Sequence, residues 1–118
     1  MDEKLVSRFI NIIQNYHQVT DSRVPVYSIA YLRNLLRDAA IPALEQMPYI
    51  VGSYYLACKS LDVPVCSKML SSSVAQLSNR FMNRIFFKAY GSPPKPEEIT
   101  DAEFKLIVAN NFEFIPVD

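Results

Sequence analysis

The sequence contains few of the residues that specialised folds and metal sites require. Its 118 residues include two glycines, two cysteines, one histidine and no tryptophan. Two glycines are too few for most small β-sandwiches, whose turns need residues with positive φ. Cys58, Cys66 and His17 do not supply the four ligands of a structural zinc site. P-loop and dinucleotide-binding motifs are also missing, so we expect neither a metal nor a cofactor.

The chain also lacks an excess of charge and a long apolar run. Twelve Lys and Arg balance twelve Asp and Glu, so the whole molecule is not attracted to nucleic acid or to an acidic membrane. The longest uncharged run, residues 46–58, has 13 residues, against roughly 20 for a membrane span. The charged N-terminus lacks the apolar segment of a secretory signal. We expect an intracellular protein, in the nucleus or the cytoplasm, with no membrane or nucleic-acid partner.

Helical periodicity, interrupted by eight prolines, is what the sequence does contain. The spacing of apolar residues predicts helices over the following segments: 3–18, 26–40, 49–61, 66–81 and 100–109. In the first of them, Leu5, Phe9, Ile12, Ile13 and Tyr16 share one face. The expected fold class is all-α, a single bundle of five to six helices. Residues 1–24 would form an extra N-terminal helix and connector, and residues 25–118 the main domain.

Two of these segments have the composition of core helices. Lys59 is the only charged residue between Pro48 and Asp62, and a helix with no polar face usually lies in the middle of a bundle. Its small residues, Gly52, Ser53 and Ala57, would let neighbouring helices approach closely. We expect burial of five residues on the two helices: Tyr54, Ala57, Leu70, Val74 and Leu77.

Residues 79–90 allow two interpretations. They either continue the preceding helix or form a turn followed by an apolar segment. A continuous helix would align Arg80, Arg84 and Lys88, which are four residues apart. Residues 63–96 carry five positive charges and no negative charge. Such a stripe can contact phosphates, although a solvated helix face is the simpler interpretation.

The C-terminal part begins with a proline-rich loop, residues 91–98. Thr100 and Glu103 then have the spacing of a capping box, in which Glu103 would be the N3 residue. After this last helix, we expect Phe112, Phe114 and Ile115 to pack against the bundle.

No constellation of catalytic residues is evident. His17 has no nucleophile or acidic partner nearby in the sequence and is interpreted as a polar residue at a helix end. The serines at 71–73 lack the glycines of a nucleophile elbow. We therefore expect that the protein is not an enzyme.

The order of these segments resembles a cyclin box, and among cyclins the fungal phosphate-pathway type. Residues 25–36 resemble the first helix of that box, and residues 49–61, with Tyr54-Tyr55-Leu56, the second. Residues 66–81 resemble the third, buried central helix, and the sequence Ser78-Asn79-Arg80-Phe81 is close to its family ending. Residues 103–114 resemble the fifth helix and the exit after it.

The resemblance implies a regulatory subunit that binds and activates a cyclin-dependent protein kinase as a heterodimer. Cyclins grip the regulatory helix of the kinase with a basic residue at the end of the third helix and a Glu in the fifth. Carried over, these positions are Arg80 and Glu103, with Phe81 and Arg84 as neighbouring partner-binding residues. Arg80 stands where cyclins usually have Lys.

Two alternatives remain open. Tyr55-Leu56-Ala57-Cys58-Lys59 followed by Val63-Pro64 is also similar to the repeat of transcription factor IIB. In that repeat the motif lies on the third helix, and the next helices carry basic residues to DNA or polymerase factors. A helical scaffold with another protein partner is the third class.

Overall fold

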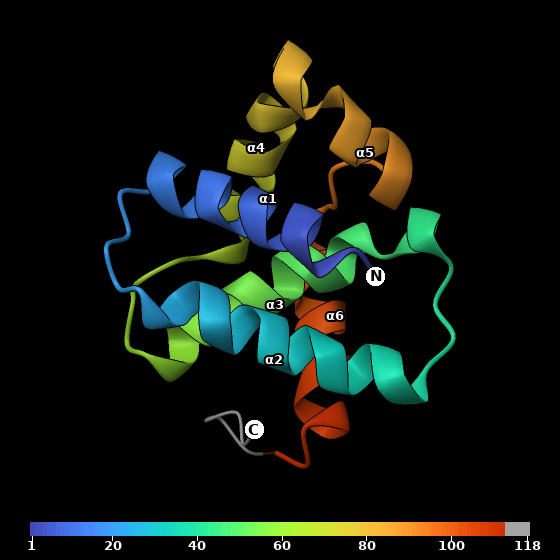
Figure 1. Ribbon diagram of the computed structural model, residues 1–118. Helices are drawn as coiled ribbons and strands as arrows, with labels where there is room; N and C mark the ends of the chain where they lie inside the picture. Colours follow the sequence, from blue (N-terminus) through green and yellow to red (C-terminus); the bar gives the residue numbers. More distant parts are fainter. Residues whose placement is uncertain (113–118) are drawn as a thin grey trace.

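The expected all-α fold is confirmed in the computed structural model, which describes residues 1–112 (Figure 1). This part of the chain contains only helices and connecting loops. The helices are α1 (Glu3–Tyr16), α2 (Arg23–Asp38), η1 (Ala43–Glu45), α3 (Met47–Ser60), α4 (Ser67–Ser78), η2 (Phe81–Asn83), α5 (Arg84–Tyr90) and α6 (Pro96–Ala109); η1 and η2 are short 3-10 helices. Within residues 1–112, no helix is both long enough and apolar enough to cross a membrane.

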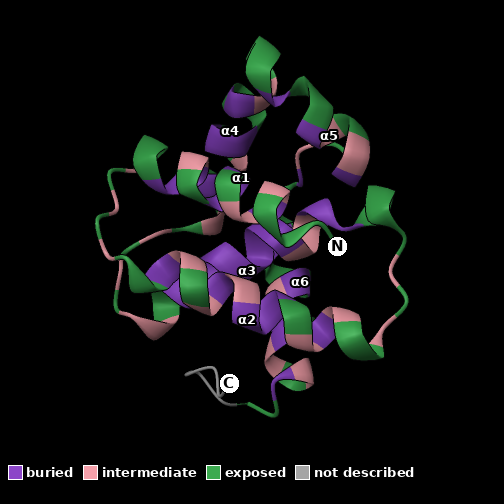
Figure 2. Ribbon diagram, in the orientation of Figure 1, coloured by how far each residue is buried: buried purple, intermediate pink, exposed green. Residues whose placement is uncertain are grey.

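Helix α3 is the centre of the bundle. It packs against α1, α2, α4 and α6, and all its residues from Ile50 to Cys58 are buried (Figure 2). Small residues allow this close packing, as the sequence predicts. A Cβ atom at Gly52 would lie 3.1 Å from the Cβ of Ala102 in α6. The Ser53 and Ser28 hydroxyls form a buried hydrogen bond of 2.7 Å between α3 and α2.

The resemblance assigned the central position to residues 66–81, and this assignment is wrong. Helix α4 packs mainly against α6 and less closely against α1 and α3, and it is amphipathic. It buries only four residues: Leu70, Ser73, Val74 and Leu77. The five expected core residues of the two helices are nevertheless all buried, because the side-chain periodicity identifies the inward face whichever helix lies at the centre.

Helix α1 belongs to the same hydrophobic core as the rest of the chain. It contributes Val6, Phe9, Ile10 and Ile13 to the core cluster. Its inward face is rotated from the expected one, and Tyr16 is 39% exposed. The side chain of Asp2 caps the helix by accepting a hydrogen bond from the Leu5 N–H.

The chain breaks after α4, so the second interpretation of residues 79–90 is confirmed. Helix α4 ends at Ser78, and η2 then leads into α5. The buried Asn83 side chain donates a hydrogen bond of 2.8 Å to the Leu77 carbonyl at the end of α4. Phe86 of α5 stacks on Phe9 at 4.1 Å between ring centroids. A continuous stripe of Arg80, Arg84 and Lys88 on one helix is therefore excluded.

Helix α6 begins four residues before the expected capping box. Pro96 is its first residue, and the carboxylate of Glu98 accepts a hydrogen bond from the Lys95 N–H. The hydroxyl of Thr100, inside the helix, donates to the Glu97 carbonyl. The predicted capping role of Glu103 is wrong, because this residue lies in the middle of α6.

The exit from α6 differs in part from the expectation. Phe112 is 63% exposed rather than packed, and Phe114 and Ile115 lie outside the described residues. Asn110 anchors the end of the helix, because its buried amide donates hydrogen bonds to the carbonyls of Leu106 and Tyr31.

Candidate functional site

The candidate site is built around an ion pair between α3 and α6. Lys59 Nζ lies 3.0 Å from Oε1 and 3.2 Å from Oε2 of Glu103. Helix α3 brings Lys59 to the surface at its last turn, where the chain leaves the core. The side chain of Glu103 is 12% exposed and that of Lys59 is 49% exposed. The pair is thus anchored on the carboxylate side and open to a partner on the ammonium side.

An aromatic ring supports the ammonium group of this pair. Lys59 Nζ lies 4.6 Å from the centroid of the Tyr55 ring, one turn earlier on α3, within the range of a cation–π interaction. Partial burial by itself lowers the pKa of Lys59. The hydrogen bond and charge of Glu103, together with Tyr55, outweigh that effect and raise the pKa above its ordinary value. Lys59 is therefore fully charged at neutral pH.

Exposed apolar residues follow the ion pair along α6. Phe104 is 63% exposed and Val108 is 46% exposed. They line a shallow apolar groove of about 480 Å³ between the end of α2 and α6, together with Leu35, Ala39, Ile41, Tyr49, Lys105 and Ala109. The site thus has a charged part and an apolar part on adjacent stripes of α6.

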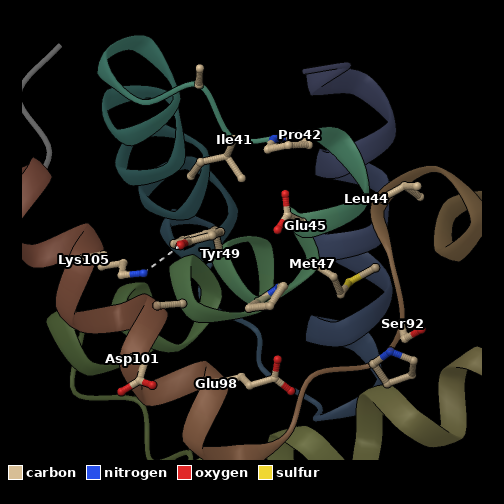
Figure 3. Close-up of a pocket in the computed structure, with 14 residues that line it drawn as sticks. Ile41, Pro42, Leu44, Glu45, Met47, Tyr49, Ser92, Glu98, Asp101 and Lys105 are labelled. Carbon is tan, nitrogen blue, oxygen red and sulfur yellow. Dashed lines mark hydrogen bonds between the residues drawn. The ribbon is translucent and has the colours of Figure 1, made fainter.

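A second groove of about 620 Å³ continues from the first past Tyr49 and Lys105 (Figure 3). Its walls are residues 40–49, which include the first turn of α3, the loop at Ser92 and Pro93, and residues 98–105 of α6. Lys105 Nζ donates a hydrogen bond of 3.3 Å to the Tyr49 hydroxyl at the boundary between the two grooves. Glu45, Glu98 and Asp101 make this second groove acidic.

The structure brings together only part of the site predicted from the sequence. Arg80 does not contact Glu103: it lies at the far end of α4, with its guanidinium 5.9 Å from the centroid of the Tyr16 ring. Phe81 is 79% exposed beside it, and Arg84 lies 5.4 Å from the Phe81 ring centroid. The expected proximity of Arg80 to Glu103 is wrong, because α4 ends before Arg80 and directs that residue away from α6.

Sequence reasoning overlooked Lys59, although a signal for it was present. Lys59 is the only charge on an otherwise uncharged helix, and such a residue must lie where the helix reaches solvent. Because residues 66–81 were interpreted as the third helix, the basic residue at the end of that helix was assigned to Arg80. If α1 is counted as the first helix of the box, and not as the extra helix expected from the sequence, α3 becomes the third helix and the basic residue in its last turn is Lys59.

The other groups that could carry chemistry are the cysteines, the histidine and the acidic side chains. Within residues 1–112, no cluster of three His, Cys, Asp or Glu residues is arranged to hold a metal ion. Burial raises the pKa of Cys58 to about 11, so its thiol is protonated at neutral pH. His17 caps the C-terminal end of α1, away from both grooves.

The chain matches no protein-family model, and no curated protein or solved structure matches it either.

Proposed function

We propose that the chain is a cyclin-like regulatory subunit that binds and activates a cyclin-dependent protein kinase. The Lys59–Glu103 pair is the observation that supports this function most directly. The resemblance to cyclins calls for a basic residue at the end of the third helix and a Glu in the fifth. The proposal counts α1 as the first helix of the box, in place of the extra helix expected from the sequence. Lys59 then lies in the last turn of the third helix, and Glu103 lies on α6, the fifth helix longer than two turns.

The pair suits the backbone groups at the end of a docking helix. Lys59 has three N–H donors, and the Glu103 carboxylate can accept further hydrogen bonds beside those from Lys59. Free carbonyls and N–H groups at helix ends form stronger hydrogen bonds with charged groups than with neutral ones. The apolar face of the docking helix would cover Phe104 and Val108.

In this proposal the domain does no chemistry itself. It holds the regulatory helix of the kinase in its active position, so that the Lys–Glu ion pair and the metal site of the kinase assemble. Lys59 thus replaces Arg80 as the basic residue of the grip, and Glu103 keeps the role that the sequence suggested.

Kinase activation by charge-altered variants tests the proposal. Glu103→Gln and Lys59→Gln each remove one charge, and we expect kinase binding to weaken by about 2–5 kcal/mol if the pair is desolvated in the complex. Arg37→Gln, which changes an exposed arginine on α2, is the matched control and should leave activation unchanged.

A double charge reversal separates partner recognition from folding. The Lys59→Glu/Glu103→Lys variant can reform the ion pair between α3 and α6, so its thermal stability should approach that of the wild type. A partner would meet reversed charges, and activation should stay impaired. Wild-type activation by this variant would mean that the pair serves the fold alone and would contradict the proposed function.

A repeat of the transcription factor IIB type is the second candidate function. It is favoured by the position of Tyr55–Lys59 on α3, the third helix of the chain. It predicts duplex DNA binding through Arg80, Arg84 and Lys88, with a logarithmic salt slope of about −0.9 per phosphate contact. Weak binding to duplex DNA that does not depend on these three residues would favour the kinase proposal.

A further inference from the structure

A second exposed surface lies at the junction of α4 and α5, away from the ion pair. We call it the tip and define it as Arg80, Phe81, Met82, Arg84 and Ile85. Its three apolar side chains are the most exposed large hydrophobic residues among residues 1–112: Phe81 is 79%, Met82 90% and Ile85 75% exposed. Figure 2 shows the exposed ribbon at the outer end of α4 and the start of α5.

The tip is held in place from its inner side. Asn83, between Met82 and Arg84, is buried and bonded to the Leu77 carbonyl. Phe86 and Tyr90 fill the core side of α5, where Phe86 also stacks on Phe9. The core-facing positions are therefore already occupied, and the exposed apolar residues belong to the opposite, outward face.

Positive charge accompanies this apolar face. Residues 63–96 carry five Lys and Arg and no Asp or Glu, so the rest of this neutral chain has a net charge of 0 − 5 = −5. Among the described residues, Arg80 and Arg84 form no ion pair; their guanidinium groups lie over the rings of Tyr16 and Phe81. Lys88 follows Arg84 by one turn of α5. The overall neutrality of the chain thus conceals a strongly basic region.

The tip protrudes from the bundle (Figure 1). The two grooves described above are lined by other segments, around α6 and residues 40–49. Protruding apolar side chains among arginines suit a partner that carries negative charge and into which apolar side chains can insert. A lipid bilayer has both properties: basic residues contact its headgroups while aromatic and aliphatic side chains enter the acyl boundary.

We propose that the tip docks on an anionic lipid bilayer, with Phe81, Met82 and Ile85 inserted and Arg80 and Arg84 on the headgroup phosphates. Guanidinium groups bind phosphate through two parallel hydrogen bonds. The tip would contact the surface of the bilayer without crossing it. This inference is independent of the proposed kinase function, because the tip and the Lys59–Glu103 pair are separate.

Co-sedimentation of the full chain with lipid vesicles tests the proposal. We expect binding to vesicles of phosphatidylcholine with phosphatidylserine, little binding to phosphatidylcholine alone, and weakening by added salt. Arg80→Gln/Arg84→Gln should lower the affinity by about tenfold or more, since each basic residue near an anionic surface contributes roughly a fivefold effect. Phe81→Ser/Met82→Ser/Ile85→Ser should abolish binding.

Matched substitutions elsewhere control for general effects of charge and hydrophobicity. Val26→Ser/Leu44→Ser changes two other exposed apolar residues, and Arg33→Gln/Arg37→Gln two arginines of α2. Both variants should bind vesicles like the wild type, and circular dichroism should show that every variant is folded.

Three results would overturn the proposal. They are no binding to anionic vesicles, equal binding to neutral vesicles, and binding that the tip substitutions leave unchanged. Duplex DNA binding that needs Arg80 and Arg84 but tolerates the triple serine variant, without vesicle binding, would assign the tip to nucleic acid instead.

Discussion

Glu103 shows how the role of a single residue depends on where its helix begins. Two start signals compete in the sequence: Thr100 with Glu103, and Lys95-Pro96 with Glu98 three residues after Lys95. In the structure the helix begins at the second signal, Lys95-Pro96. Proline is favoured at the first helical position, and the earlier start brings Ile99, which is fully buried, onto α6. Glu103 is thereby released from a capping role and meets Lys59.

We expect His17 to make stability dependent on pH. Burial lowers its pKa below 6.5, and its Nε2 atom is buried without a hydrogen-bond partner. The unfolded chain therefore binds a proton more readily than the folded one. The stabilising contribution is present above pH 6.5 and is lost as pH falls through the folded-state pKa, with a slope of at most about 1.4 kcal/mol per pH unit.

Urea denaturation at pH 7.5 and pH 5.5 measures this effect. The wild type should lose more stability between the two values than His17→Gln, which cannot titrate. Identical losses in the two proteins would show that protonation of His17 is not linked to folding.

Gly91 is a position that no other residue fits without strain. Its φ is +108° and its ψ is 180°, a conformation that is essentially restricted to glycine. A Cβ atom there would lie 2.3 Å from the Leu44 carbonyl oxygen. Gly91→Ala should cost at least about 1–3 kcal/mol of unfolding free energy, measured by urea denaturation. Gly52→Ala, where φ is ordinary helical and the nearest atom to the added Cβ is the Ala102 Cβ at 3.1 Å, is the comparison and should cost less.

At the scale of elements, α4 illustrates what amphipathic periodicity can and cannot predict. The burial of Leu70, Val74 and Leu77 was predictable from their spacing alone. The end of α4 at Ser78 was not, because the Asn83 side chain reaches the Leu77 carbonyl only after the chain has turned away from the helix. The substitution Asn83→Ala would remove the side-chain amide that donates a hydrogen bond to the Leu77 carbonyl.

A substitution inside α4 tests the assignment of its inward face. Leu70 is fully buried, and Leu70→Ala should destabilise the protein by roughly 2–5 kcal/mol through lost burial and the resulting cavity. Met69→Ala, one residue away but 45% exposed, should cost much less. Equal thermal midpoints for the two variants would contradict the packing of α4.

At the scale of the molecule, α1 and the remaining helices share one core. Phe9 stacks on Phe86, and Ile10 and Ile13 are fully buried. A chain that begins at residue 21 would expose these contact surfaces. We expect that it loses the cooperative thermal transition of the full chain, followed by circular dichroism.

Replacement of the outer face of α1 provides the control. Arg8, Asn11 and Asn15 are exposed, and their joint replacement by Ala should preserve cooperative unfolding. Cooperative unfolding of the truncated chain at the same temperature as the full chain would instead mean that α1 is dispensable.

The sequence by itself determined the all-α class, the positions of most helices and the burial of Tyr54, Ala57, Leu70, Val74 and Leu77. These features follow from local periodicity and from proline, which act within one or two helical turns. The uncharged composition of residues 49–58 was also sufficient to predict a helix in the middle of the bundle.

Only the tertiary structure decided which residues meet across the bundle. The pairing of Lys59 with Glu103 joins residues 44 positions apart. The break after Ser78 sends Arg80 to the tip rather than toward α6. Neither is encoded by spacing along one helix, because each depends on how α3 crosses α6 and on the side chains that fill the core between α1 and α5.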